Sequence, residues 1–157
     1  MAMSQPPIFS DADTAAAHPP RRPTPAALNM LESARQHLRD AAATTVPELR
    51  YVSAHMAGLR AAAAVLAQRG EPTQRPSRRR RPRSVWEMLP EAAPELREWA
   101  AFFAAGAAKR AAAEANLPSA VTAAEADDLL KDAQVFLSLA ETTVGVPRHP
   151  TVLPRAS

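Results

Sequence analysis

The amino-acid sequence predicts an all-α protein: an antiparallel bundle of four long helices and one short helix, with disordered N- and C-terminal tails. Three observations favour this fold class. Alanine makes up about a quarter of the chain and only 4 of its 157 residues are glycine, a composition that favours helix throughout. Apolar residues recur at steps of three and four, the period of a helix with one buried face. Helix-start signals precede several of these apolar stretches.

The ends of the chain are predicted to lie outside the core. Residues 1–23 hold five prolines among small and charged residues, so apolar burial cannot offset the entropy of ordering this arm. Residues 145–157 begin with Gly145 and contain three further prolines, which end helical order. We therefore predict one folded domain over residues 24–144 between two disordered segments.

The first two predicted helices have the most regular apolar patterns. Thr24 followed by Pro25 reads as an N-cap with proline at the first helical position, which predicts a helix over residues 25–42. Its inner face includes Leu28, Leu31 and Leu38. A second helix is predicted over residues 46–69, with Gly70 as its stop. Its expected buried stripe consists of Leu49, Val52, Met56, Leu59, Ala63 and Leu66.

Three helices are predicted in the second half of the chain. A short helix covers residues 85–89, and Pro90 and Pro94 break or bend it before a long helix over residues 94–115. The last helix covers residues 123–143. Capping boxes are predicted at three helix starts, namely Thr45 with Glu48, Ser84 with Glu87, and Thr122 with Glu125. The aromatic side chains expected to fill gaps between the alanine-rich helices are Trp86, Trp99, Phe102 and Phe103.

Positive charge is concentrated in the Pro- and Arg-rich loop predicted at residues 70–83. Nine residues of this loop hold Arg75, Arg78, Arg79, Arg80, Arg81 and Arg83. Without these arginines the chain carries 13 Lys and Arg against 16 Asp and Glu, so the helical body is mildly acidic. Because arginine binds phosphate oxygens bidentately, the loop is the predicted contact for RNA or another polyanion. The alternative is a solvated linker with no particular ligand.

Several classes of site are excluded or unsupported by the sequence. The chain has no cysteine, which excludes disulfides, thiolate nucleophiles and Cys-ligated zinc. It has no Gly-rich phosphate loop, HExxH motif or serine elbow, and we predict neither a cofactor nor a metal. Apolar runs of signal-peptide or membrane length are lacking, so we expect no export, no membrane contact and a cytoplasmic location.

One pair of residues is a candidate catalytic site. Residues 50–55, near the start of the second predicted helix, read Arg-Tyr-Val-Ser-Ala-His, and Arg50 and His55 have the spacing of the HEPN superfamily motif. Wider stretches resemble an actinobacterial subfamily of HEPN-domain proteins, and the resemblance spans residues 25–143. These stretches are Arg-Pro-Arg-Ser-Val-Trp-Glu-Met-Leu-Pro at 81–90, Glu-Trp-Ala-Ala-Phe-Phe-Ala-Ala-Gly-Ala-Ala at 98–108 and Glu-Ala-Asp-Asp-Leu-Leu-Lys-Asp-Ala at 125–133.

The resemblance implies a compact helical bundle that is often dimeric, with a metal-independent ribonuclease site where two protomers meet in the active members. On that model His55 would move a proton during attack of a ribose 2′-hydroxyl on the adjacent phosphate, and Arg50 would hold the phosphate. Five residues at about 100° each separate the two side chains by about 140° around the helix, so one substrate would contact both only through long side chains or a second protomer. In the alternative, structural interpretation, His55 packs its ring on a neighbouring helix and Arg50 is a solvated surface residue.

Three functional hypotheses follow. The first is a HEPN-like binding module for nucleic acid or nucleotides, with a homodimer as its expected form. The second is a metal-independent endoribonuclease with a composite site of Arg50 and His55 at a dimer interface. The third is a protein-interaction adaptor without nucleic-acid binding, which meets an unknown protein partner through its tails or its acidic last helix, where Asp127, Asp128 and Asp132 lie.

Overall fold

The computed structural model describes residues 21–70 and 82–147, and these residues form helices and connecting loops with no strand. The elements are α2 (Pro25–Ala43), α3 (Pro47–Arg69), α4 (Val85–Ala92), the 3-10 turn η1 (Pro94–Leu96), α5 (Arg97–Glu114) and α6 (Ala123–Val144). The prediction of four long helices and one short helix is therefore confirmed. The predicted tails, apart from the residues next to the bundle, and residues 71–81 of the arginine-rich loop lie outside the described part.

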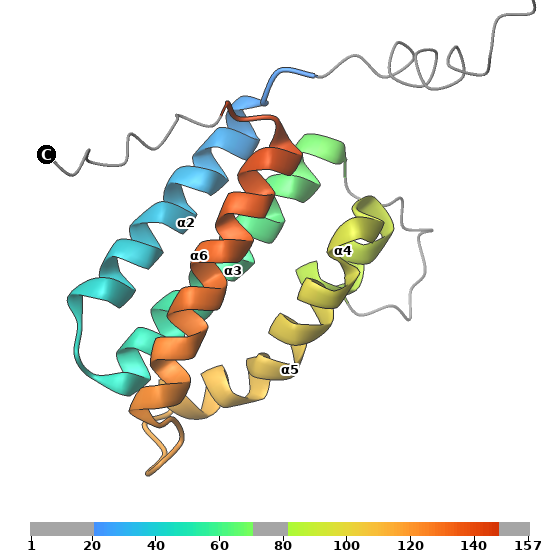
Figure 1. Cartoon of the computed structure of the whole chain (residues 1–157). Coiled ribbons are helices and arrows are strands. Elements are labelled where there is room, and N and C mark those ends of the chain that lie inside the picture. Colours follow the sequence, from blue (N-terminus) through green and yellow to red (C-terminus); the bar gives the residue numbers. More distant parts are fainter. Residues whose placement is uncertain (1–20, 71–81, 148–157) are drawn as a thin grey trace, which may run out of the picture.

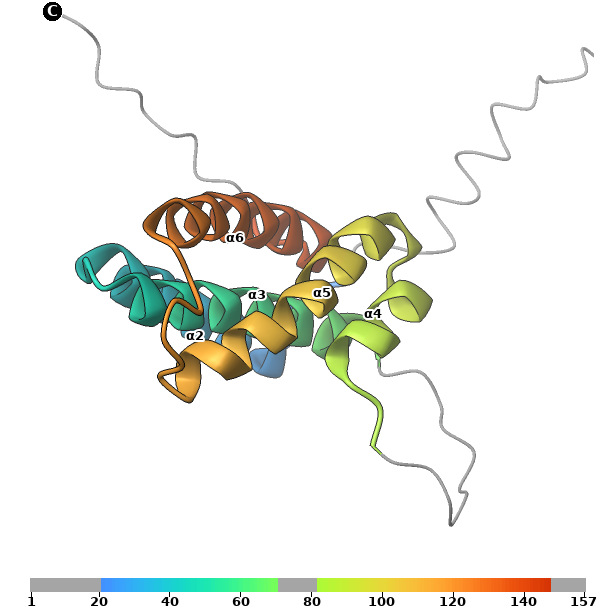
Figure 2. The same ribbon diagram turned by 90° about the horizontal axis from the view of Figure 1, so that it is seen from below.

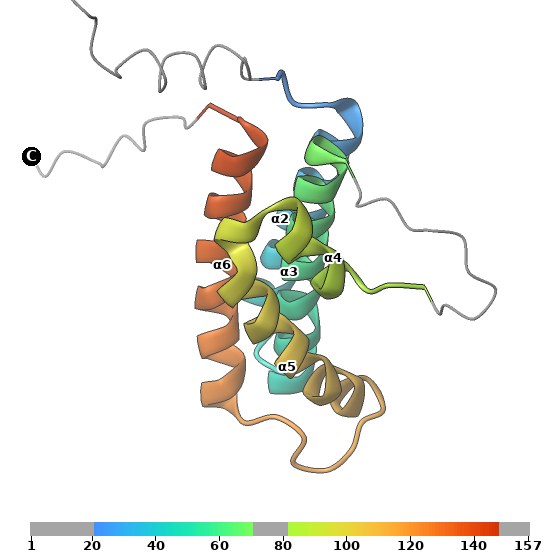
Figure 3. The same cartoon turned by 90° about the vertical axis from the view of Figure 1, so that its right-hand side faces the viewer.

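The long helices alternate in direction along the chain. The helices α2 and α3 form an antiparallel pair, α5 runs back across them, and α6 returns beside α3 (Figure 1). Helix α3 is central, because it packs against α2, α4, α5 and α6. Seen from below, α6 lies on one side of the bundle and α2 and α3 on the other (Figure 2). Helices α4 and α5 lie across the face between them (Figure 3).

Local capping signals set several of the helix starts. Thr24 accepts a hydrogen bond from the backbone amide of Ala27, with Pro25 at the first helical position, as predicted. Ser84 caps α4 in the same way, and the full capping box of Thr122 and Glu125 begins α6. The third predicted capping box was wrong. Helix α3 starts one residue later, at Pro47, and its N-cap Val46 has no side chain that can accept a hydrogen bond.

Small residues bring α3 close to its neighbours. A Cβ atom added to Gly58 of α3 would lie 2.4 Å from Cε1 of Phe103 on α5, so this crossing requires glycine. The Phe103 ring is fully buried and stacks on Trp86, with ring centroids 4.9 Å apart, and it also packs near Trp99 and Phe136. The prediction that the tryptophans belong to the core is confirmed for Trp86, which is buried, while Trp99 is partly buried against the core.

The predicted inner faces were partly wrong. Leu49 is 56% exposed, and Leu28 and Phe102 are also exposed. In α3 the fully buried face is made instead by Ala54, Ala57, Ala61 and similar small residues. The reason is that α3 is enclosed by four other helices, so small side chains that permit close contact replace the large ones expected from periodicity. No helix in the described ranges is long and apolar enough to cross a bilayer.

Candidate functional site

His55 lies in the middle of α3, where it faces α5. Its ring is fully buried. The Nε2 atom is 2.9 Å from the backbone carbonyl oxygen of Phe103, and Nδ1 is 3.3 Å from Nη1 of Arg110. Because a carbonyl only accepts and a guanidinium only donates, Nε2 carries the proton and Nδ1 accepts from Arg110. Both ring nitrogens are therefore occupied by partners on α5.

The surroundings of His55 favour the neutral imidazole. Burial lowers the pKa of His55 below its ordinary value of 6.5, the hydrogen bond to Phe103 opposes this shift, and the nearby positive charge of Arg110 adds to it. A neutral imidazole is the form that a general base needs. However, the lone pair on Nδ1, which a general base would use to take up a proton, already accepts a hydrogen bond from Arg110. In this arrangement the residue joins α3 to α5.

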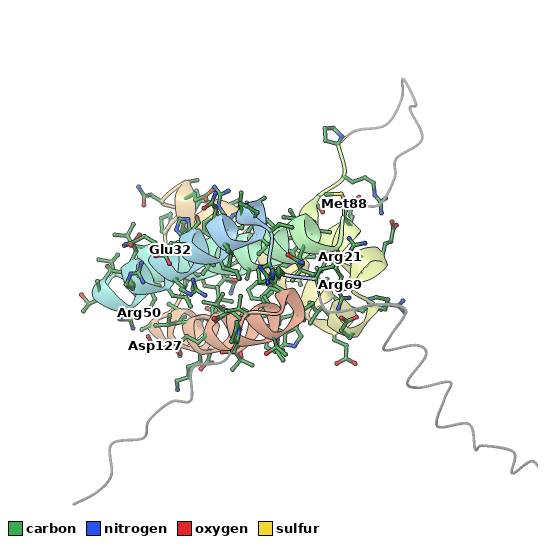
Figure 4. All side chains as sticks on the ribbon, turned by 90° about the horizontal axis from the view of Figure 1, so that it is seen from above. Arg21, Glu32, Arg50, Arg69, Met88 and Asp127 are labelled. Atoms are coloured by element: carbon green, nitrogen blue, oxygen red, sulfur yellow. The ribbon has the colours of Figure 1, made fainter. Side chains whose placement is uncertain are left out.

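Arg50 lies one turn and a half before His55 on α3 and has a separate set of partners. Its Nε donates to the carbonyl oxygen of Ala41 at 3.0 Å and its Nη2 to that of Thr44 at 2.6 Å. These carbonyls lie at the C-terminal end of α2, where they have no partner within the helix. Its Nη1 pairs with the carboxylate of Asp127 on α6, and Figure 4 shows the two side chains at the same end of the bundle. We call this set of contacts the Arg50 junction.

The two residues of the sequence motif are thus used in different places within one chain. Arg50 contacts the end of α2 and the start of α6, whereas His55 contacts α5. His55 also lines a pocket between α3, α5 and α6, and Arg50 does not. Within residues 21–70 and 82–147, the side chains of Arg50 and His55 share no hydrogen-bond partner.

The arginine-rich loop enters the described part of the chain only at its end. Arg83 pairs with the carboxylate of Glu91 on α4 and also approaches the carbonyl oxygen of Glu87. The other loop arginines, Arg75, Arg78, Arg79, Arg80 and Arg81, lie outside the described residues.

A pocket of about 410 Å³ opens between α3, α5 and α6. We call it the α5–α6 pocket. Its polar lining consists of Tyr51 and His55 from α3, Lys109 from α5, and Glu125, Asp128 and Asp132 from α6. Its remaining lining consists of Phe102, Phe103, Ala105, Gly106 and Leu129. Lys109 and Glu125 form an ion pair across the pocket.

Sequence reasoning did not identify this pocket. The only available signal was that Asp128 and Asp132 stand four residues apart on the last helix, and therefore on one face. Tyr51 takes the bulky position of the HEPN-like motif, directly after Arg50, and this position did not indicate a pocket. In the pocket lining, α5 comes close to α3 at Gly106, where an added Cβ would lie 3.0 Å from the hydroxyl oxygen of Tyr51. Among the described residues, no group of three or more His, Asp or Glu side chains could hold a metal ion.

A family model places this bundle among known proteins. The model described as HEPN_SAV_6107-like HEPN matches residues 41–141, from the end of α2 to the last turn of α6. This range is more than half of the 157-residue chain, so the chain belongs to this HEPN family and the predicted HEPN membership is confirmed. No curated protein and no solved structure matches the chain.

Proposed function

We propose that this HEPN-family protein is a binding module for RNA or a related polyanion, and that it contacts phosphates through the arginine-rich loop. The observation that carries the proposal is the distribution of charge. Nine residues hold six arginines, and no acidic residue lies between Arg75 and Arg83. The rest of the chain has an excess of three acidic residues, with 13 Lys and Arg against 16 Asp and Glu.

Ion pairing within the bundle supports this separation. Most basic side chains of the described helices have a carboxylate partner: Arg35 with Glu141, Arg39 with Glu32, Arg50 with Asp127, Arg69 with Glu95, Lys109 with Glu125 and Arg110 with Glu114. Charges compensated in this way attract a distant phosphate only weakly at physiological salt. A nucleic acid approaching the protein would therefore find its strongest attraction at the loop.

Binding without cleavage is the form of the proposal that the site geometry supports. In the described bundle His55 is buried with both ring nitrogens occupied, and Arg50 has its donors on Ala41, Thr44 and Asp127. A nuclease built on these residues would first have to break those contacts. The ribonuclease and the protein adaptor are the two other outcomes of the experiment below.

The test is a titration of full-length protein with a fluorescently labelled single-stranded RNA, in EDTA, at low and moderate salt. We expect salt-sensitive binding, with the RNA intact on a denaturing gel. Replacing Arg80 and Arg81 by serine should weaken binding strongly. The matched control replaces Arg97 and Lys131, two exposed basic residues of the bundle, and also removes two positive charges. It should weaken binding far less.

Other outcomes identify the alternatives. Equal losses in the two double variants would show that net charge alone attracts the RNA, which contradicts a loop site. Cleavage in EDTA that disappears in His55→Gln would establish the nuclease, because glutamine can still donate to Phe103 and accept from Arg110 but cannot act as a proton carrier. Absence of binding even at low salt would reject the module and leave the protein adaptor.

A further inference from the structure

The polar groups of the α5–α6 pocket are not all satisfied by the protein. Tyr51 is only 6% exposed and lines the pocket, and its hydroxyl has no hydrogen-bond partner among the described residues. Burial raises the pKa of Tyr51 above its ordinary value of 10.0, so the phenol is neutral at pH 7. A hydroxyl that opens into a cavity without a partner in the protein is available to a ligand, as donor and as acceptor.

Two carboxylates in the same pocket also lack a partner. Asp128 and Asp132 lie one turn apart on α6, and neither forms an ion pair within the described chain. The neighbouring acidic residues of α6 do have basic partners: Asp127 pairs with Arg50, and Glu125 pairs with Lys109. Besides the Lys109–Glu125 pair, the pocket therefore holds two carboxylates that have no basic partner among the described residues. Ionisation of the Asp132 carboxyl group is disfavoured, because burial and then the charge of Asp128 raise its pKa.

The other wall of the pocket is apolar and aromatic. Phe102 is 44% exposed, although it is a large apolar side chain, and it lines the cavity beside the fully buried Phe103. An aromatic face attracts a cation and also packs against an apolar body. Uncompensated carboxylates in the same pocket as such a face select against phosphate and for a positively charged nitrogen. A metal ion is a poorer match, because no sufficient set of ligands exists in the described residues.

We infer that the α5–α6 pocket binds a small organic cation, whose charged nitrogen is held by Asp128 and Asp132 and whose apolar body packs on Phe102. The Tyr51 hydroxyl accepts a further hydrogen bond from the same nitrogen. This inference goes beyond the proposed RNA binding, since it uses other residues and a ligand of opposite charge. It does not depend on the arginine-rich loop.

The test uses 2-phenylethylamine as the probe. Its binding to the full-length protein is measured by isothermal titration calorimetry and by nuclear magnetic resonance of the ¹⁵N-labelled protein. We expect a dissociation constant of about 1 mM for this small ligand. The neutral 2-phenylethanol and the anionic 3-phenylpropionate have the same ring and should bind at least about tenfold more weakly. Shifted amide signals should come from α5 and α6 around the pocket.

Variants make the inference specific. Asp132→Asn and Asp128→Asn should each weaken binding of the amine by about tenfold, and Tyr51→Phe by a few-fold. The matched control Asp40→Asn removes one exposed carboxylate from α2, which does not line the pocket, and should bind the amine as the wild type does. Circular dichroism confirms that each variant is folded. Equal affinity for the amine and the alcohol, full affinity in both pocket aspartate variants, or no binding at tens of millimolar would overturn the inference.

Discussion

Two neighbouring regions of the bundle use neighbouring residues in opposite ways. Arg50 and Tyr51 are consecutive on α3, and Asp127 and Asp128 are consecutive on α6. In the Arg50 junction, Arg50 and Asp127 pair with each other, and the arginine also binds the end of α2. In the α5–α6 pocket, Tyr51 and Asp128 have no partner in the described chain. A step of one residue turns a side chain by about 100° around each helix, and this separates the two regions.

The difference indicates which polar residues stabilise the fold and which are available for binding. A buried or half-buried polar group with all its bonds made within the protein stabilises the native state, and its loss leaves other groups unsatisfied. A similar group without a partner is retained at a cost in stability, which is typical of binding sites. His55 lines the pocket, but we expect it to stabilise the fold as Arg50 does, because both of its ring nitrogens already have partners within the protein.

The largest effect is expected for His55→Ala. The substitution removes a fully buried ring together with its hydrogen bonds to Arg110 and to the Phe103 carbonyl, so we expect a loss of about 2–4 kcal/mol in the free energy of unfolding. Urea denaturation measures this loss. His55→Gln, which keeps both hydrogen bonds, should retain most of the stability. If alanine is tolerated without loss, the ring does not support the fold and His55 belongs with the binding residues instead.

The next largest effect is expected for Arg50→Ala. The change leaves the carbonyl oxygens of Ala41 and Thr44 and the Asp127 carboxylate without their donor, for a loss of about 1–3 kcal/mol. The control Arg97→Ala, at an exposed position of α5, should stay within about 0.5 kcal/mol of the wild type. Equal midpoints of urea unfolding for the two variants would remove the distinction between the junction and ordinary surface arginines.

A smaller effect should appear on acidification. The lowered pKa of His55 means that the unfolded chain takes up a proton near pH 6.5 while the folded chain does not, so stability falls as the pH drops through 6.5. The paired carboxylates Glu91 and Glu95 have lowered pKa values and add their own loss only nearer to and below pH 4.5. Urea midpoints at pH 7.5 and 5.5 should therefore differ more for the wild type than for His55→Gln. The same difference in both proteins would show that other groups are responsible.

The smallest effect has the opposite sign. The raised pKa of Asp132 means that its ionised form costs stability at pH 7, because the folded chain holds the proton more tightly than the unfolded chain. Asp132→Asn removes a like charge one turn from Asp128 and should stabilise the protein by about 0.2–0.5 kcal/mol. Asp127→Asn, five positions earlier on α6, should destabilise it by breaking the pair with Arg50. Destabilisation by both substitutions would mean that the pocket aspartates also support the fold.

Local signals explain what could be predicted from the sequence. Thr24 with Pro25 and Thr122 with Glu125 set helix starts through contacts within a few residues, so their spacing alone was sufficient. The capping box of Thr45 was wrong because Pro47 takes the first position of α3 and makes Val46 the N-cap. The extended stretches that resemble the family, rather than the Arg50 and His55 spacing, predict the HEPN membership, and the family match confirms it.

The functional groups were less predictable because they depend on contacts far apart in the sequence. Whether His55 has a free nitrogen depends on Phe103 and Arg110, which lie 48 and 55 residues later. Whether Tyr51 has a partner depends on where α5 crosses α3, and the close approach at Gly106 determines that. Sequence periodicity identifies a helical face but does not say which neighbour will cover it.

The central claim is that the arginine-rich loop binds RNA while Arg50 and His55 maintain the fold. The most direct measurement is the salt dependence of RNA affinity for three proteins: the wild type, His55→Gln, and a variant with serine at residues 78–81. Loss of four phosphate contacts should lower the slope of log affinity against log salt concentration by up to about 3. The account predicts this reduction in the serine variant, and a wild-type slope with intact RNA in His55→Gln. An unchanged slope in the serine variant would contradict it.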